Sequence, residues 1–231
     1  MKKLSLMLMV LFSLSHAQDD EYPVINGCKL EPNANCAKIN LSNQNLQNLD
    51  LQNANFEGAN FEGAILDGVN FTKAKLKNAN FKNAKLRHSN LQQADMFKVN
   101  LENANLARAD LRHTNLKAAT AFNANFDAIK GWALFGQGSK YDGSSFHGAD
   151  LNFARMSGSS MKNCNLQAVN LEAAWMANVN FESSNFTNAN LQETKPSNSS
   201  LFKANLTGTR IHFANLADVF MEECINCPIN W

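Results

Sequence analysis

Large apolar residues recur at every fifth position, and this spacing dominates the chain. Thirty-seven positions lie five apart from Leu41 to Met221, and all are Leu, Phe, Met, Ile or Tyr except Ala121, Gly131, Gly136 and Pro196. A small or β-branched residue lies two positions before most of the large ones, often with Asn between them. A helix needs a period of 3.6 residues and a strand a period of 2, so this pattern predicts a solenoid of stacked coils.

The five-residue units carry a family resemblance. Residues 54–58 (ANFEG), 104–108 (ANLAR) and 109–113 (ADLRH) resemble the A-(N/D)-L-x-x unit of pentapeptide-repeat proteins, and similar units cover about four fifths of the chain. The resemblance implies an all-β fold, a right-handed quadrilateral β-helix with one unit per side, four units per coil and about nine coils. At a β spacing of about 4.8 Å, the rod is about 45 Å long.

Elementary packing supports this arrangement. The large and small residues of each unit interlock if both point inward, whereas the three other positions are rich in Lys, Glu, Gln, Asn and Thr and face water. Asn before the large residue, as at Asn55 and Asn105, is expected to support the corners, because its short amide tolerates turn dihedrals and bonds to nearby backbone. A single coil leaves both flat faces open, so only a stack is stable.

The N-terminus predicts export. Two lysines precede an apolar run from Leu4 to Leu14, and small residues lie at the expected distances before Gln18. This is typical of a secretory signal peptide over residues 1–17 with cleavage after Ala17, and the apolar run is too short to span a membrane. We therefore expect a periplasmic or secreted protein without a membrane span in the mature chain, although an uncleaved membrane anchor is the alternative.

The cysteines divide the mature chain into a rod and two caps. We expect an N-terminal cap over residues 18–36, the β-helix over 37–223 and a C-terminal cap over 224–231. An open solenoid end exposes apolar surface and unpaired backbone, so cross-linked caps are favourable in an oxidising compartment. The sequence predicts disulfides within both caps and a buried free thiol inside the rod, involving Cys28 with Cys36, Cys224 with Cys227, and Cys164 alone. A metal or redox motif is the alternative for the last pair.

Charge argues against nucleic-acid binding. Without Lys2 and Lys3 the mature chain has 19 basic and 20 acidic residues, a net charge of −1. A nucleic-acid binder needs a concentrated basic stripe, and a DNA mimic needs a strongly acidic one. Residues twenty apart stack in successive coils, so Lys82 and Lys162 are expected to pair with acidic residues of neighbouring coils on a mixed, solvated surface.

Candidate chemistry is sparse. The histidines are scattered over different faces, so no two are placed to share a metal ion. No Ser/His/Asp arrangement, phosphate-binding glycine loop or spaced carboxylate pair stands out. We therefore expect no enzyme activity, no cofactor and no metal.

The repeat is irregular at residues 131–140. Gly131 and Gly136 take two positions that large residues occupy elsewhere, and the bulky groups move to Trp132, Leu134 and Phe135. The segment either stays in the coil as two imperfect units with Leu134 inward, or leaves it as a loop. The glycines favour a loop.

Outward aromatic residues supply the candidate partner-binding site. Trp175 and Arg155 lie twenty apart with Lys195 one coil further, so they should stack, and Phe135 joins them if residues 131–140 stay in the coil. Exposed aromatics beside Arg are common anchors of protein interfaces. The candidate residues are Trp132, Leu134, Phe135, Arg155 and Trp175. Isolated surface aromatics packed on neighbouring side chains are the alternative.

These observations favour a noncatalytic exported binding or scaffold protein. We expect its partner to be another protein and not a nucleic acid. The family resemblance supplies the alternative, a DNA-mimicking modulator of a type II topoisomerase. The export signal and the near-neutral charge of the mature chain disfavour that function.

Overall fold

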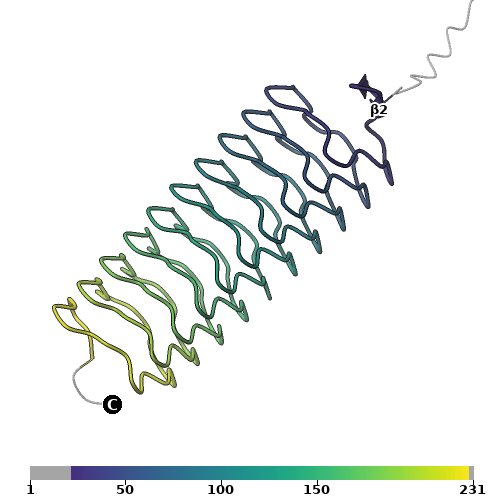
Figure 1. Cartoon of the computed structure of the whole chain (residues 1–231). Helices are drawn as coiled ribbons and strands as arrows, with labels where there is room; N and C mark the ends of the chain where they lie inside the picture. Colours follow the sequence, from purple (N-terminus) through teal and green to yellow (C-terminus); the bar gives the residue numbers. More distant parts are fainter. Residues whose placement is uncertain (1–21, 229–231) are drawn as a thin grey trace, which may run out of the picture.

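The computed structural model describes residues 22–228, which form a straight rod of stacked coils (Figure 1). Parallel bridges connect residues exactly twenty apart, from Asn35 with Asn55 to Asn205 with Ile225. The 191 residues from Asn35 to Ile225 therefore make about nine and a half coils. The fold is the predicted right-handed quadrilateral β-helix. The predicted signal peptide lies outside the described residues.

Each coil is square because every unit contains a tight turn. The amide of the small residue donates to the carbonyl of the large residue three positions earlier, as from Ala54 to Leu51 at 3.2 Å. The residue between them on the outside has a positive φ, 57° at Asn53. A positive φ at the third turn position is the mark of a type II turn and favours Asn or Gly. Four such turns bring the chain back above its starting point.

Asparagines before the large residues do not supply these dihedrals, so that part of the prediction is wrong. Their expected bonds to nearby backbone are present: Asn55 Oδ1 accepts the amide of Glu57 at 3.1 Å. Asn55 Nδ2 also donates to Asn35 Oδ1 in the preceding coil at 2.8 Å. The amide side chains thus stabilise both their own corner and the contact between coils.

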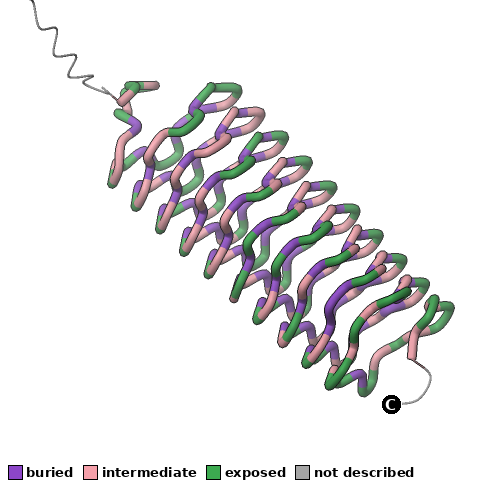
Figure 2. Tube along the Cα trace, turned by 180° about the vertical axis from the view of Figure 1, so that it is seen from behind, coloured by how far each residue is buried: buried purple, intermediate pink, exposed green. Residues whose placement is uncertain are grey.

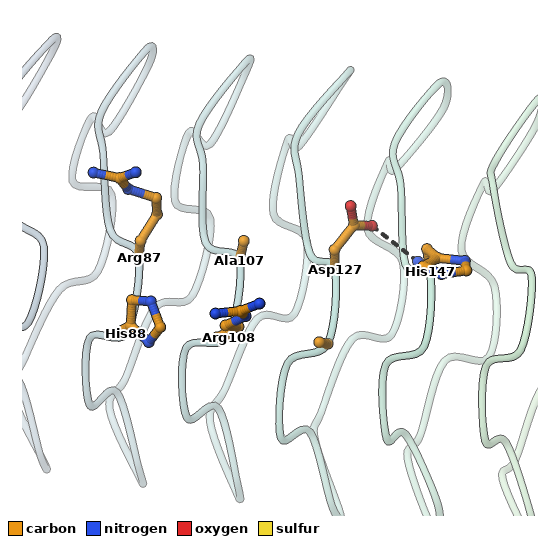
Figure 3. Close-up of a pocket in the computed structure, with 7 residues that line it drawn as sticks. Arg87, His88, Ala107, Arg108, Asp127 and His147 are labelled. Carbon is orange, nitrogen blue, oxygen red and sulfur yellow. Dashed lines mark hydrogen bonds between the residues drawn. The ribbon is translucent and has the colours of Figure 1, made fainter.

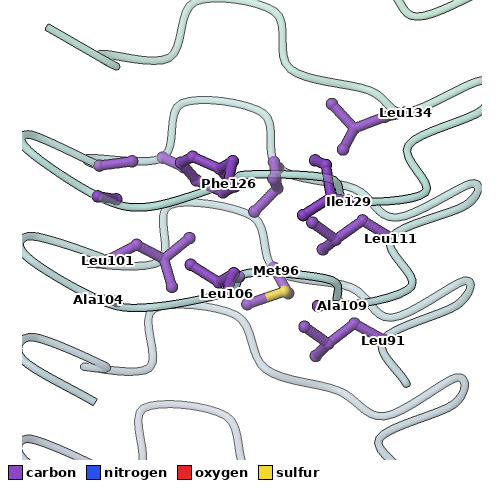
Figure 4. Close-up of a cluster of buried hydrophobic side chains, with 14 of the residues drawn as sticks. Leu91, Met96, Leu101, Ala104, Leu106, Ala109, Leu111, Phe126, Ile129 and Leu134 are labelled. Atoms are coloured by element: carbon purple, nitrogen blue, oxygen red, sulfur yellow. The ribbon is translucent and has the colours of Figure 1, made fainter. Parts of the chain in front are cut away.

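The core consists of the two predicted inward columns, and buried residues recur in every coil along the rod (Figure 2). Leu106 is fully buried and Ala104 is almost so, with successive coils packing above and below them (Figure 4). Phe61 and Phe81, one coil apart, stack with ring centroids 4.7 Å apart. Because the coil spacing is fixed by backbone hydrogen bonds, side chains of the same column must fit one another closely.

Residues 131–140 stay in the coil as two imperfect units, the first of the two alternatives, and do not form the loop that the glycines favour. Gly131 and Gly136 take inward positions, and their amides donate to carbonyls of the next coil at 2.7 and 2.8 Å. Larger neighbours fill the space that their side chains would take. A Cβ on Gly131 would lie 2.6 Å from Leu151 Cδ2, and one on Gly136 would lie 2.6 Å from Met156 Sδ. Core packing therefore accounts for the glycines.

Both ends of the rod carry the predicted disulfides. Cys28 bonds to Cys36 and Cys224 to Cys227, with Cα atoms 5.8 and 5.7 Å apart. At the N-terminal end, a short antiparallel hairpin of β1 (Val24–Ile25) and β2 (Cys28–Lys29) lies over the first coil (Figure 1). The bridged coils run two residues beyond the predicted limits of 37 and 223 at each end.

Cys164 is a free, buried thiol of the small inward column, as predicted. Its Sγ donates to the carbonyl of Tyr141 at 3.1 Å. Burial raises the pKa of the Cys164 thiol to about 12, so the group stays protonated at neutral pH. It acts as a small apolar residue of the core.

Ion pairs follow the twenty-residue spacing. Lys82 pairs with Glu102 at 3.0 Å and Lys162 with Glu182 at 2.7 Å, both between neighbouring coils. Both pairs lie on the solvated surface, so they contribute little to stability. They confirm the mixed, solvated surface that the charge pattern predicts.

Candidate functional site

Four outward residues form one row along a side of the rod, and we call them the aromatic–cation row: Phe135, Arg155, Trp175 and Lys195. Successive members are bridged to one another, one coil apart. Each immediately precedes a buried inward residue, Gly136, Met156, Met176 or Pro196. Successive residues of a strand point to opposite faces, so the row faces outward. Trp175 is 54% exposed. The predicted stacking of these residues is confirmed.

Cations contact both rings of the row. Arg155 lies between the rings, with its guanidinium carbon 5.3 Å from the Phe135 centroid and 5.6 Å from that of Trp175. The Lys195 ammonium lies 5.4 Å from the Trp175 centroid, and that of Lys117 lies 5.4 Å from the Phe135 centroid. Cation–π contacts of this kind hold the long side chains in a defined arrangement.

A second aromatic group lies at the turn that precedes the row. Trp132 meets His113 edge to face, with centroids 4.7 Å apart, and meets Phe153 at 6.1 Å. Trp132 is 39% exposed and Phe153 is 51% exposed. Prediction from the sequence omitted His113 and Phe153 from the site. Their positions, 19 residues before and 21 residues after Trp132, place all three at one corner in successive coils and were a usable signal.

Leu134 does not belong to this surface, so its assignment as a partner-binding candidate is wrong. Its side chain is only 2% exposed and packs inside the rod. The reason is that residues 131–140 keep the phase of the repeat, which gives Leu134 the small inward position of its unit. The other four candidates, Trp132, Phe135, Arg155 and Trp175, lie on neighbouring positions of the outer surface.

A shallow hollow extends the row toward the N-terminal end. It measures about 340 Å³ and is lined by Gln93, Ala94, Asp95, His113, Asn115, Lys117 and Phe135. Asp95 is already engaged, because it pairs with Lys77 at 3.2 Å and accepts from Asn115 Nδ2 at 2.9 Å. The hollow therefore offers the Phe135 ring and the Lys117 ammonium to a bound group.

Another hollow, of about 410 Å³, lies at a different corner and has mixed charge (Figure 3). Arg87 turns away from it to pair with Asp67 of the preceding coil. Partial burial raises the pKa of Asp67, but hydrogen bonds from Arg87 outweigh it and hold that pKa below its usual value. Asp127 accepts the amide of His147 at 3.0 Å. These groups largely satisfy one another.

The described residues offer little for catalysis. Within 22–228, no group of three or more His, Cys, Asp or Glu side chains is close enough to hold a metal ion. Burial raises the pKa of Tyr141 as it does that of Cys164, and both lie in the core, away from any substrate. No helix in this part of the chain could cross a membrane. What the surface presents is a concentration of rings and cations suited to binding.

Comparison with known proteins identifies the repeat. The family model for pentapeptide repeats matches in 8 copies, over residues 33–63, 64–103, 100–128, 137–167 and 164–201, more than two thirds of the chain. The gap between 128 and 137 contains Gly131 and Gly136, which lack the large side chain found at these positions in most other units. No curated protein sequence matches the chain significantly.

Several solved structures are similar to the chain. HetL, a pentapeptide repeat protein involved in heterocyst differentiation regulation in the cyanobacterium Nostoc, is 23% identical over 81% of this chain and 89% of its own, with a TM-score of 0.36. A trypsin-treated form of QnrB1, a plasmid-mediated fluoroquinolone resistance protein, is 15% identical over 82% and 90%, with a TM-score of 0.39. A pentapeptide repeat protein from the Arabidopsis thaliana thylakoid lumen is 22% identical over 58% and 68%, with a TM-score of 0.30.

Proposed function

The chain belongs to the family of pentapeptide-repeat proteins, and on this premise we propose that it is an exported, noncatalytic binding or scaffold protein. Its rod presents a rigid surface to another protein, and the binding face contains the aromatic–cation row and Trp132. Solenoids commonly bind partners along such extended surfaces.

One observation carries this proposal: exposed aromatic rings gather at one side of the rod with cations that form no ion pair among residues 22–228. Tyr, Trp, Phe and Arg are the residues most enriched in protein interfaces, and the strongest anchors among them are Trp, Tyr and Arg. Trp175 and Phe153 are each about half exposed. Exposed apolar side chains that lie close together are typical of interaction sites, whereas scattered single ones are not.

Export is supported by the N-terminal sequence and by cysteine usage. Residues 1–17 have the basic start, apolar stretch and small residues of a secretory signal. Disulfides persist in oxidising compartments and are rare in the cytosol, so the bonds at Cys36 and Cys224 favour a periplasmic or secreted location.

A DNA-mimicking modulator of a type II topoisomerase is less well supported. DNA mimicry needs a continuous acidic surface, whereas acidic residues of this rod alternate with cations. Glu102 and Glu182, for example, are each paired with a lysine of the neighbouring coil.

The test is capture of the partner from an envelope extract by the immobilised protein. We expect Trp132→Ala and Trp175→Ala to reduce the captured amount at least tenfold while the unfolding midpoint stays unchanged. Phe220→Ala is the matched control, because Phe220 is 51% exposed on a different side of the rod, and it should capture as the wild type does. Equal capture by all variants would overturn the proposed binding face.

A further inference from the structure

The way the rings of the row are oriented determines which chemistry they can bind. Trp175 has Arg155 over one face and Lys195 over the other, from the coils on either side. Phe135 is likewise contacted by Arg155 and Lys117. The ring faces are therefore occupied, and what the rod presents outward is the ring edges. An aromatic face is negative and its edge positive, so these edges attract acceptor and anionic groups.

The indole of Trp175 strengthens this preference. Its Nε1–H is a donor only, and it makes no hydrogen bond in the described part of the chain. The ring is half exposed, so the donor can reach a bound carboxylate or carbonyl oxygen. The exposed part of the row thus consists of positive ring edges, an N–H donor and the cationic groups.

Among residues 22–228, the cations of the row have no carboxylate partner. Lys82 and Lys162 each find a glutamate one coil away, but Arg155 and Lys195 have rings in the equivalent positions. Between residues 22 and 228, neither of them nor Lys117 forms an ion pair. Glu193, the acidic residue closest to the row in sequence, does not pair with Lys195 either. The positive charge of the row is therefore available to a ligand.

The spacing of these cations restricts the shape of the ligand. Arg155 and Lys195 are two coils apart, which is about 9.6 Å at a β spacing of about 4.8 Å. A polyproline II segment has three residues per turn and a rise of about 3.1 Å per residue, so every third side chain points the same way at intervals of about 9.3 Å. Acidic side chains at every third position match the two cations, and the backbone between them then passes Trp175.

We propose that the aromatic–cation row recognises an extended acidic segment of a protein partner, in a polyproline II-like conformation with carboxylates three residues apart. One carboxylate binds Arg155 and the next binds Lys195, while carbonyl oxygens between them accept from the Trp175 indole and contact the ring edges. This inference rests on the proposed function, because it specifies the chemistry of the partner at the same face.

Synthetic peptides test the inference without knowledge of the partner. The probe is a fluorescein-labelled peptide of four Glu-Pro-Pro repeats, which favours the required conformation, and fluorescence anisotropy measures its binding to the full-length mature protein. Three control peptides replace Glu by Gln, replace Glu by Lys, or insert a fourth residue into each repeat. We expect the Glu-Pro-Pro peptide to bind at least tenfold more tightly than each control. Its binding should weaken as added salt screens the charges.

Protein variants assign the binding to the row. Arg155→Gln and Lys195→Gln should each weaken binding of the peptide about fivefold, which is the effect of losing one exposed ion pair. Lys140→Gln is the matched control, because Lys140 is an exposed lysine on another side of the rod that forms no ion pair within the described residues, and it should leave binding unchanged. Equal binding of the Glu and Gln peptides, or equal binding by all three variants, would overturn the inference.

The outcomes separate this inference from the proposed function. Capture of an envelope protein that depends on Trp132 and Trp175, without binding of the Glu-Pro-Pro peptide, would contradict the acidic segment and leave the binding face intact. If every variant keeps both partner capture and peptide binding, the binding face and the acidic segment are both contradicted.

Discussion

Truncation of a central core residue, Leu106→Ala, should destabilise the rod by about 3–5 kcal/mol. Leu106 is fully buried, and burial of a leucine side chain contributes about 1.5–3 kcal/mol. The cavity left behind adds to that loss, because measured Leu→Ala changes in cores span about 2–5 kcal/mol according to how far the site can collapse. Here collapse is opposed by the backbone.

The coils around Leu106 are held at fixed spacing. The amide of Leu86 donates to Asn105 in the coil of Leu106 at 2.7 Å, and the amide of Leu106 donates to Asn125 of the next coil at 2.7 Å. Phe126 lies above Leu106 in the same column (Figure 4). The cavity therefore persists, which places the expected loss in the upper part of the range, about 3–5 kcal/mol.

Guanidinium denaturation followed by circular dichroism measures the change, with Asn105→Ala as the neighbouring control. Asn105 Oδ1 accepts the amide of Ala107 at 3.1 Å, and losing that bond should cost about 0.5–1.5 kcal/mol. Equal, small losses in both variants would refute the assignment of Leu106 to the core.

Other predictions follow from the core and the ion pairs. Gly131→Ala should lower the free energy of unfolding by about 1–3 kcal/mol, because its Cβ would overlap Leu151; an unchanged denaturation midpoint would contradict this. Cys164 should resist Ellman's reagent at pH 8 in the native protein, because it is buried and its pKa is raised to about 12. Unfolding without reductant should expose one reactive thiol per chain, and rapid labelling of the native protein would contradict its burial. Asp67 has a lowered pKa beside Arg87, so its stabilising effect is present above about pH 4 and lost as the pH falls through the folded-state pKa. The difference in melting temperature between the wild type and Asp67→Asn should therefore shrink between pH 7 and pH 3; a constant difference would contradict the ion pair.

The fold could be predicted because the five-residue period indicates a solenoid and the resemblance of its units to pentapeptide repeats implies a quadrilateral β-helix. The stacking of Arg155 on Trp175 followed from the same count, since residues twenty apart lie above one another. The placement of 131–140 could not be predicted. Glycine usually marks turns, and only the three-dimensional packing reveals that Leu151 and Met156 fill the space above Gly131 and Gly136.

The candidate site could be predicted only in part, for a similar reason. Contacts along one row follow from the twenty-residue rule, but those between neighbouring rows depend on side-chain directions. The Trp132 contacts with His113 and Phe153 cross from one row to the next, as does the contact of Lys117 with Phe135. A count of positions places these residues on one side of the rod without showing which of them touch.

The binding face is the central claim, and site-specific photocrosslinking tests it most directly. A benzoylphenylalanine replaces Phe153, which lies beside Trp132, in one variant and Phe220 in another, and each is produced in the native organism and irradiated. The proposed face predicts a defined crosslinked product at position 153 that is absent at position 220. Crosslinking at position 220 alone, or to the same extent at both positions, would contradict it.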